Sequence, residues 1–399
     1  MDTAQISAIN AWLIDQGLLG RSEALLLSGF CERCRNAGLP LVQAAIFFDT
    51  LHPVNESRGL YWDLAKSPSV SQTEYSRYEA EDNARRWHGS PFHHMLENNL
   101  AELHLPLDEA NDKRFSILGD LREEGQSDYL ALIHHLGNDE VNGEMDNIYS
   151  RWSTSTPGGF GEDDIGALHK LAPALALAIK SVSLSQTARA LVEVYLGKDA
   201  GSRVLRGRIG RGRVESISAV LWFSDMENYT MLSEHIDSNE LIPLLNDYSE
   251  AVISSVQEAG GDVLKLIGDG ALALFRHDDA TRAAEAALQA QQRLQTRLES
   301  LRDSRLRGGR PHTSIYVALH VGSVFYGNIG SDERLDFTVV GPAVNEVCRI
   351  SSTCRQVGQS LLVSREFLDL LPASAAVLFR SNGTHSLKGV SGKRELFGY

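Results

Sequence analysis

The run GGDVLKLIGDGALALF, residues 260–275, restricts the fold more than any other stretch of this sequence. Two short apolar segments flank Gly268, Asp269 and Gly270, and apolar runs of this length bounded by glycine favour β-strands. An Asp-Gly tip between two strands favours a tight hairpin turn. The run therefore predicts an antiparallel strand pair inside a sheet. A turn alone would explain the acid, so the rest of the chain must decide whether Asp269 has a chemical role.

Length and charge limit the classes of protein that the chain can represent. With 399 residues and a hydrophobic fraction of 43%, we expect two globular domains rather than disorder. The formal net charge of −14 argues against a nucleic-acid-binding protein, which needs a basic surface. A small anionic ligand in one local basic pocket is still compatible with this charge.

The four cysteines are too few for a disulfide framework in a chain of this length. Cys31 and Cys34 form a CxxC without a second pair, so a reduced structural pair is favoured over a zinc or redox site. No apolar run approaches the ~18 residues that a membrane span requires, and the N-terminus lacks the features of a signal peptide. We therefore expect no membrane span and a cytoplasmic protein.

Residues 1–185 have the pattern of an α/β domain with a mixed sheet. Helical periodicity covers 6–16 and 22–36, strand-like composition covers 41–48, 59–64, 128–136 and 147–154, and a long helix follows 164. Residues 186–214 then begin as a helix and end in a basic, glycine-containing stretch. This segment is interpreted as a linker, and two hypotheses remain open: a helix that couples two domains, or a solvated connector.

Residues 215–399 show an α+β succession with a mixed sheet. Strands are expected at 217–223, 314–322, 324–330 and 337–340 besides the hairpin, and helices at 241–256, at 279–301 and from Pro342 onward. Asp225 is expected just past the end of the first strand, and Asp269 at the hairpin tip. Neighbouring carboxylates repel unless a cation joins them, and Mg²⁺ binds one or two carboxylates together with substrate phosphates.

Basic and amide side chains accompany these acids. Alternation along a strand places Lys265 on one face with Val263, Ile267 and Asp269. Placing a lysine inside an apolar strand is costly unless its ammonium group binds a partner or reaches solvent. Both explanations remain open for Lys265. Asn345 and Arg349 are four residues apart on an expected helix, so they point to one place; an ordinary surface pair would give the same spacing.

Four motifs in order give these residues a specific interpretation: FSDMENYT, VLKLIGDGALALF, ALHVGSVFYGNIG and DERLDFTVVGPAVNEVCRI. Together they resemble the catalytic domain of class III nucleotidyl cyclases over residues 215–399, which implies a ferredoxin-like, palm-type fold. The related diguanylate cyclase domain shares the glycine-acid hairpin but would not pair it with the Thr, Asn and Arg segment. GGFGEDDIGALHKLAPALALAI is similar to the end of GAF domains, so residues 1–185 are predicted to be a GAF- or PAS-type sensory domain.

The resemblance implies a role for each matching residue. Two Mg²⁺ or Mn²⁺ ions would bind Asp225, Asp269 and the backbone carbonyl of Met226. Lys265 and Thr338 would select adenine, since guanylate cyclases typically carry Glu and Cys at these positions. The remaining matches are Asn345 for the ribose, Arg349 for the transition state, and Arg334 and Lys388 for the triphosphate. Glu227-Asn228, Pro342 and Val347-Cys348 depart from the family pattern without removing any of these groups.

The implied reaction is cyclisation of ATP to 3′,5′-cyclic AMP and pyrophosphate at the interface of a homodimer, under control of the N-terminal domain. A guanylate or pyrimidine-nucleotide cyclase and a nucleotide-binding pseudoenzyme switch are the alternatives. In the N-terminal half, the histidines of WHGSPFHHM and several tryptophans leave a metal, haem or small-molecule site open. Ordinary surface or core positions are the favoured explanation, because no carboxylate or cysteine spacing supports a site.

Overall fold

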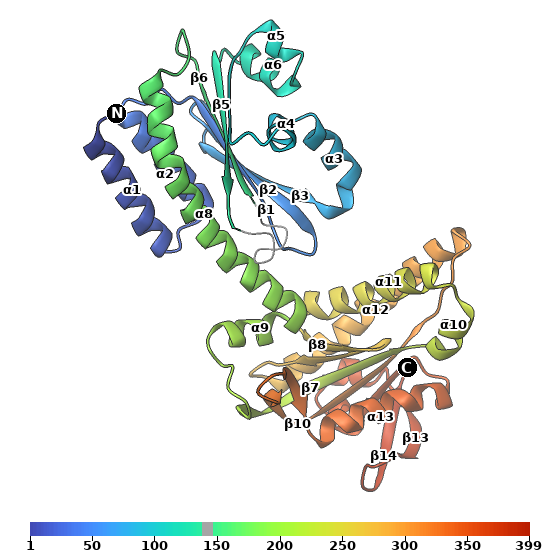
Figure 1. Cartoon of the computed structure of the whole chain (residues 1–399). Helices are drawn as coiled ribbons and strands as arrows, with labels where there is room; N and C mark the ends of the chain where they lie inside the picture. The colour runs from blue at the N-terminus through green and yellow to red at the C-terminus, as the bar shows by residue number, and fades with distance from the viewer. Residues whose placement is uncertain (138–146) are drawn as a thin grey trace. The chain divides into compact units, whose positions relative to one another are not determined.

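The chain folds into two compact units, Met1–Leu191 and Val192–Tyr399, in a computed structural model that describes residues 1–137 and 147–399 (Figure 1). The sequence placed the boundaries at 185 and 214 instead, with a separate linker between the two domains. Each unit has its own sheet and its own buried core.

The first unit contains a six-stranded sheet in the order β3-β2-β1-β6-β5-β4. Its strands are β1 (Gln43–Asp49), β2 (Asn55–Asp63), β3 (Val70–Ser76), β4 (Glu102–Pro106), β5 (Asp128–His135) and β6 (Asn147–Thr154). The mixed sheet expected from the sequence is wrong, because every described neighbour pair in this sheet is antiparallel. β3 and β4 were missed because β3 is polar and mostly exposed and β4 is short.

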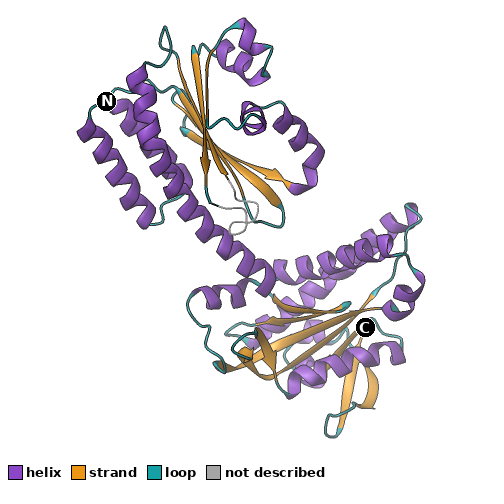
Figure 2. Cartoon of the chain, in the orientation of Figure 1, coloured by secondary structure: helices purple, strands orange, loops and turns teal. Residues whose placement is uncertain are grey.

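Helices cover both faces of this sheet (Figure 2). One group consists of α1 (Thr3–Leu18), α2 (Glu23–Asn36) and α8 (Glu162–Leu196). The other consists of α3 (Ala80–His88), α4 (Pro91–Glu97), α5 (Glu109–Asp112) and α6 (Ser116–Glu123), preceded by the 3₁₀ turn Arg77–Glu79. Because side chains alternate along a strand, Trp152 packs in the core beside α8 while Tyr149 packs in the core beside α4 and α6.

The helix α8 contradicts the premise that no apolar run of the chain is long enough for a membrane span. It is the one helix in the described part of the chain that is long and apolar enough to do so, judged by length and composition. Leu168, Leu171, Leu175 and Ile179 of this helix are fully buried in the core of the first unit. This packing is that of a core helix, and the core helix of a globular domain can be as long and as apolar as a membrane-spanning helix.

The cysteines and histidines of the first unit were weighed from the sequence as possible metal, haem or redox sites. Cys31 and Cys34 are buried free thiols on α2, and burial raises the pKa of Cys34 to about 12, which fits an inert structural role. His88 and His93 contact each other at 3.0 Å, whereas His94 contacts Arg114. The described residues contain no group of three or more side chains that could hold a metal ion.

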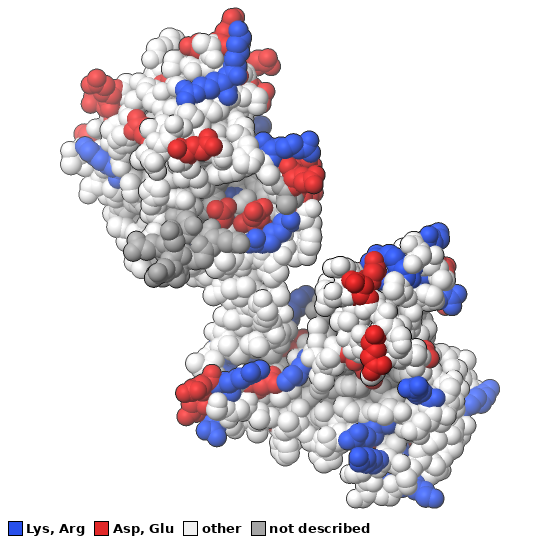
Figure 3. Space-filling model, turned by 45° about the vertical axis from the view of Figure 1, so that its right-hand side comes forward, with Lys and Arg blue, Asp and Glu red and all other residues white. Residues whose placement is uncertain are grey.

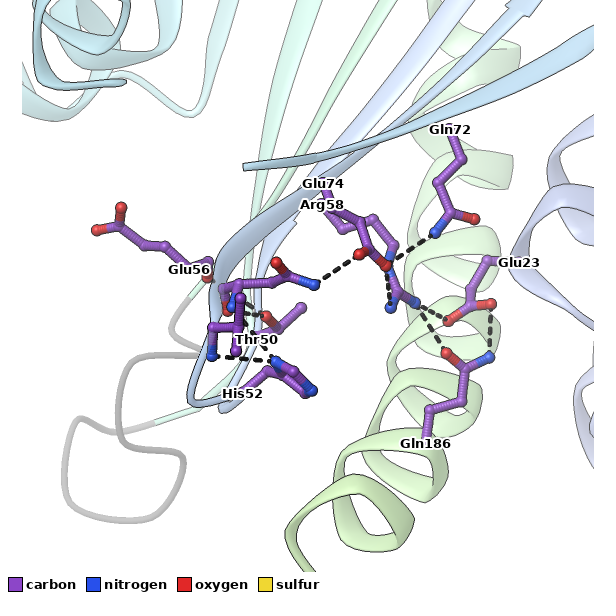
Figure 4. A network of polar contacts seen from close by, with 10 residues as sticks. Glu23, Thr50, His52, Glu56, Arg58, Gln72, Glu74 and Gln186 are labelled. Carbon is purple, nitrogen blue, oxygen red and sulfur yellow. Dashed lines mark hydrogen bonds and ion pairs between the residues drawn. The ribbon is translucent and has the colours of Figure 1, made fainter. Parts of the chain in front are cut away.

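A polar network joins the sheet of the first unit to α8 (Figure 4). Arg58 of β2 donates to Gln186 of α8 at 2.8 Å and pairs with Glu74 of β3 at 3.1 Å and Glu23 of α2 at 3.4 Å. Gln186 in turn donates to Glu23 at 2.8 Å. Glu23 is almost fully buried, so its carboxylate depends on these donors for compensation.

The second unit is built on an eight-stranded sheet with the order β13-β14-β12-β10-β7-β9-β8, and β11 pairs with β10 (Figure 1). The strands are β7 (Val214–Met226), β8 (Asp262–Ile267), β9 (Gly270–Phe275), β10 (Ile315–Gly330), β11 (Leu335–Val340), β12 (Leu361–Ser364), β13 (Arg380–Ser386) and β14 (Lys393–Gly398). The sequence predicted two strands where β10 runs as one, because Gly322 and Ser323 continue its pairing with β7 without interruption.

Helices also lie on both faces of this sheet. They are α10 (Tyr229–His235), α11 (Ser238–Glu258), α12 (Ala280–Arg307), α13 (Pro342–Val357), α14 (Arg365–Leu368) and α15 (Ala373–Ala376). Val220 and Trp222 of β7 pack in the core formed with α11 and α12, and the alternate residues Ala219 and Leu221 pack in the core formed with α13. Pro342 is a first-turn residue of α13, as predicted.

The predicted linker is folded onto the second unit. Its helix α9 (Lys198–Leu205) buries Ala200 completely, and Asp199 accepts hydrogen bonds from Arg203 and from Tyr326 of β10, both at 2.8 Å. Further along, Asn328 of β10 donates to the backbone carbonyl of Arg208 at 2.7 Å. These contacts exclude a connector that is merely solvated.

The network around Arg58 generates a stability prediction. Arg58→Ala leaves the buried Glu23 carboxylate with one described donor, so we expect the free energy of unfolding of the first unit to fall by about 2 kcal/mol. Urea unfolding of the full chain followed by tryptophan fluorescence measures this, since four of the five tryptophans lie in residues 1–191. Arg85→Ala is the matched control, because its pair with Asp82 is exposed and should be worth under about 0.5 kcal/mol. Equal effects of the two substitutions would contradict the interpretation.

Candidate active site

The hairpin predicted for residues 260–275 is present, with a two-residue loop formed by Gly268 and Asp269 between β8 and β9. Gly268 has a positive φ of 64°, as the first loop residue of a type II′ turn does. A Cβ at Gly270 would lie 2.9 Å from the backbone oxygen of Ser224 and 3.2 Å from a carboxylate oxygen of Asp225. Glycine at 270 therefore allows β9 to approach β7 closely and brings the hairpin tip beside Asp225.

Asp225 and Asp269 are brought together, although Asp225 is placed differently from the prediction. It lies within β7, one residue before the end, where it pairs in register with Tyr316 of β10. Asp269 accepts a hydrogen bond at 3.2 Å from the backbone N–H of Met226. Partial burial, followed by the charge of Asp269 and a hydrogen bond to it, raises the pKa of Asp225 to about 7.

This pair fits a divalent cation. Two carboxylates that share a half-buried site disfavour each other's charged form, and a cation between them removes that penalty. The donor set consists of hard oxygens from Asp225, Asp269 and the adjoining backbone, which suits Mg²⁺ or Mn²⁺ better than a softer metal. Two carboxylates leave further coordination positions for water or substrate phosphates.

Lys265 lies on the same face of the sheet as Asp225. The pairings Phe223–Leu272 and Leu272–Lys265 continue across β7, β9 and β8, and Leu272 belongs to the core on the α13 side. A register irregularity separates Val263 from Lys265, and Val263 instead opposes Ala273, which belongs to the core on the α11 side. The predicted grouping of Val263 with Lys265 is therefore wrong, because the strand bulges between them.

The Lys265 ammonium forms an ion pair with Asp336 of β11. Thr338 is two residues further along the same strand, so it lies on the same side of β11 as Asp336. The fold thus brings the two positions predicted to select the base, Lys265 and Thr338, to one place within a single chain. Sequence analysis missed Asp336, although its spacing from Thr338 placed it on the same strand face.

Asn345 and Arg349 are exposed on one side of α13, and their side chains have no described hydrogen bond or ion pair. Cys348 lies beside them. Burial raises the pKa of its thiol, and the charges of Arg349 and Asp225 act on it in opposite directions. This turn of α13 is therefore close to the Asp225 end of β7. No described contact joins Asn345 or Arg349 to the carboxylates, so the predicted site between two copies of the chain stays a prediction.

The predicted triphosphate contacts lie in loops. Arg334 directly precedes β11, and Lys388 lies between β13 and β14. Both are exposed, and neither side chain has a described partner. Among the departures from the family pattern, Glu227 bonds to the hydroxyl of Tyr316, and burial and this bond raise the pKa of that tyrosine.

Comparisons with known proteins identify relatives of the second unit. Residues 212–399 match the family described as the adenylate and guanylate cyclase catalytic domain. An adenylate cyclase from Anabaena cylindrica is 30% identical over 212 residues, which make up 51% of this chain and 41% of that protein. Adenylate cyclase 1 from Rhizobium meliloti (strain 1021) is 27% identical over 176 residues, 44% of this chain and 26% of that protein. The crystal structure of the adenylyl cyclase CyaB from P. aeruginosa aligns with a TM-score of 0.43 and 25% identity, covering 47% of this chain and 95% of that one.

The match of residues 212–399 to the adenylate and guanylate cyclase catalytic domain confirms the family that the four motifs predicted. The prediction of an N-terminal α/β region followed by a cyclase domain is confirmed. The chain spans less than half the length of the two curated relatives named above. The GAF- or PAS-type character of the first unit stays a prediction.

The carboxylate pair generates a prediction that does not depend on turnover. Asp225→Asn removes the repulsion with Asp269, so at about pH 8 without divalent metal we expect the second unit to gain on the order of 1 kcal/mol, a value reduced for solvent screening of a half-buried group. Adding Mn²⁺ should raise the melting temperature of the unaltered chain and have little effect on the variant. Calorimetry of both proteins measures the two effects.

Asp303→Asn is the control for this experiment, because Asp303 is an exposed residue of α12 far along the chain from the hairpin. It should leave both the melting temperature and the Mn²⁺ response unchanged. Equal stabilisation of Asp225→Asn and the unaltered chain by Mn²⁺ would contradict a metal site at this carboxylate.

Proposed function

We propose that the chain is an adenylate cyclase that converts ATP to 3′,5′-cyclic AMP and pyrophosphate. The observation that carries the proposal is the position of Lys265, which lies on the Asp225 face of the sheet and is held by Asp336 next to Thr338. An ammonium group only donates hydrogen bonds. It therefore suits N1 of adenine, which accepts, and not N1 of guanine, which carries a proton.

Each of the other residues of the site would have a separate role in the reaction. Asp225, Asp269 and the backbone carbonyl of Met226 would hold two Mg²⁺ or Mn²⁺ ions, which supply neutralisation of the triphosphate and a more acidic 3′-hydroxyl. In the reaction a bond forms between the 3′-oxygen and the α-phosphorus, and the bond from that phosphorus to the pyrophosphate oxygen breaks. Arg349 would stabilise the charge on the α-phosphate, and Asn345 would orient the ribose. Arg334 and Lys388, whose side chains have no partner among the described residues, would bind oxygens of the triphosphate that leave as pyrophosphate.

The assignment implies a homodimer. Asn345 and Arg349 are exposed on α13 and form no described contact with the carboxylates of their own chain. A two-fold arrangement would place them opposite Asp225 and Asp269 of a second copy, which gives two equivalent sites. Both sites would then depend on how the two catalytic units are held together.

The first unit is proposed to regulate this arrangement, as a sensory domain in residues 1–185 joined through 186–214 to the catalytic domain in a cytoplasmic protein. The network of Arg58, Glu23 and Gln186 fixes α8 to the sheet of the first unit. The next helix, α9, is bonded to Tyr326 of β10 in the second unit. Regulation by the first unit would therefore act through the segment of the chain that contains α8 and α9.

The direct test is a turnover assay with the full chain, Mg²⁺ or Mn²⁺, and ATP, GTP, CTP and UTP in competition. We expect cyclic AMP as the main product. A preference for GTP, CTP or UTP would overturn the role given to Lys265 and Thr338. A complete lack of product from dimeric protein would favour the pseudoenzyme switch instead.

Asp269→Ala should abolish turnover while the fold is retained. Asp278→Ala, a substitution of an exposed residue outside the site, should leave turnover unchanged.

The dimeric site is tested by mixing two inactive variants, Asp269→Ala and Arg349→Ala. Half of the dimers in an equal mixture contain one copy of each, and each such dimer has one intact site, so about a quarter of the original activity should return. Either variant alone should show none. A mixture that stays inactive although the subunits exchange would contradict a site shared between two copies.

A further inference from the structure

The first unit contains a cavity of about 240 Å³ between its sheet and α6. Its walls come from β1, β2, β3, β6, the segment between β2 and β3, and α6 with the residue that follows it. Pockets for drug-sized ligands usually measure about 300–1,000 Å³, so this cavity suits a smaller molecule. The residues at its two ends differ in charge, and this difference indicates what kind of molecule would bind.

The deep end of the cavity is marked by Arg151 of β6. Its register neighbours on both sides are alanines, Ala45 of β1 and Ala131 of β5, which leave room above the sheet for the long side chain. Arg151 is only 8% exposed, and its Nη1 atom is buried without a hydrogen-bond partner. Within residues 1–137 and 147–399, no carboxylate forms an ion pair with it.

A buried guanidinium without a counter-ion is costly. An unpaired buried charge loses its hydration without compensation, and such groups are normally paired, hydrogen-bonded or used for binding. Folding alone does not need this arginine, since an apolar residue between two alanines would fill the space without that cost. A planar guanidinium is also the side chain best suited to bind a carboxylate through two hydrogen bonds.

The mouth of the cavity is acidic. Asp120 and Glu124, at the end of α6, line it and are exposed. Glu124 accepts from the Gln43 amide at 2.7 Å, whereas Asp120 has no described partner. The third acid of the wall, Asp63, is already compensated by Lys66 at 3.2 Å and by Gln43 at 3.1 Å. The free charges are therefore one cation at the deep end and two carboxylates at the mouth.

We propose that this cavity binds a small zwitterion of the α-amino acid class, with its carboxylate on Arg151 and its ammonium group near Asp120 and Glu124. A simple anion would gain from Arg151 but would face two carboxylates of the same sign at the mouth. A simple amine would leave Arg151 buried and unpaired. A molecule that carries both charges satisfies both ends, and the limited volume restricts it to a compact side chain. The first unit is then the ligand-binding part of the chain.

The first experiment screens the full chain against the standard α-amino acids by thermal shift and measures dissociation constants by calorimetry. We expect at least one compact amino acid to bind saturably. Its carboxamide and its N-acetyl derivative, each lacking one of the two charges, should bind at least about tenfold more weakly. Binding by no amino acid would overturn the proposal, and so would equal affinity for the N-acetyl derivative, which indicates a simple carboxylate ligand.

The second experiment uses Arg151→Met, which keeps the length of the side chain and removes its charge. We expect affinity to fall at least about tenfold, while the melting temperature without ligand stays equal or rises because a buried unpaired charge is gone. Should this variant fail to fold, Asp120→Asn combined with Glu124→Gln, both exposed positions, gives the same test and should weaken binding several-fold. Arg122→Gln is the control, because Arg122 pairs with Asp112 and lies outside the cavity lining. Unchanged affinity in Arg151→Met or in the double variant would contradict the site.

Discussion

The close approach of β9 to β7 at Gly270 is the constraint on which the catalytic unit depends. A side chain there would meet the backbone of Ser224, so only glycine lets the hairpin tip lie beside the end of β7. The result is a pair of half-buried carboxylates, Asp225 and Asp269, in which burial and the charge of Asp269 raise the pKa of Asp225. Selection for stability alone would not retain two carboxylates that repel each other. A divalent cation bound between them would remove this repulsion, so the pair fits a site that binds a cation and a triphosphate.

The same strands also position the group proposed to select the base. The register of β7, β9 and β8 puts Lys265 on the face that carries Asp225, and Asp336 of β11 holds its ammonium next to Thr338. This exposed pair contributes little to stability by itself. The ion pair instead fixes the direction of a flexible side chain that is proposed to meet one edge of a purine.

On the faces seen in Figure 3, acidic and basic side chains form separate small groups rather than one continuous basic surface.

Much of this arrangement could be predicted from the sequence, because its signals are local. The Asp-Gly dipeptide predicted the hairpin, although Gly268 and Asp269 form its loop. Pro342 predicted the start of α13, and the spacing of Asn345 and Arg349 placed both on one side of that helix. The features that were missed depend on tertiary context. Strand β10 continues through Gly322, a residue that normally suggests a break, and the bulge before Lys265 reverses the face of Val263. The ion-pair partner Asp336 and the unpaired guanidinium of Arg151 appear only once distant strands are placed side by side.

The most direct test of the central claim is a crystal structure of the full chain with Mn²⁺ and a non-cyclisable ATP analogue, with the metal located by anomalous scattering. The account predicts anomalous density between Asp225 and Asp269, and the adenine edge within hydrogen-bond distance of Lys265 and Thr338. Anomalous density away from both carboxylates, or a base bound at another face of the sheet, would contradict it.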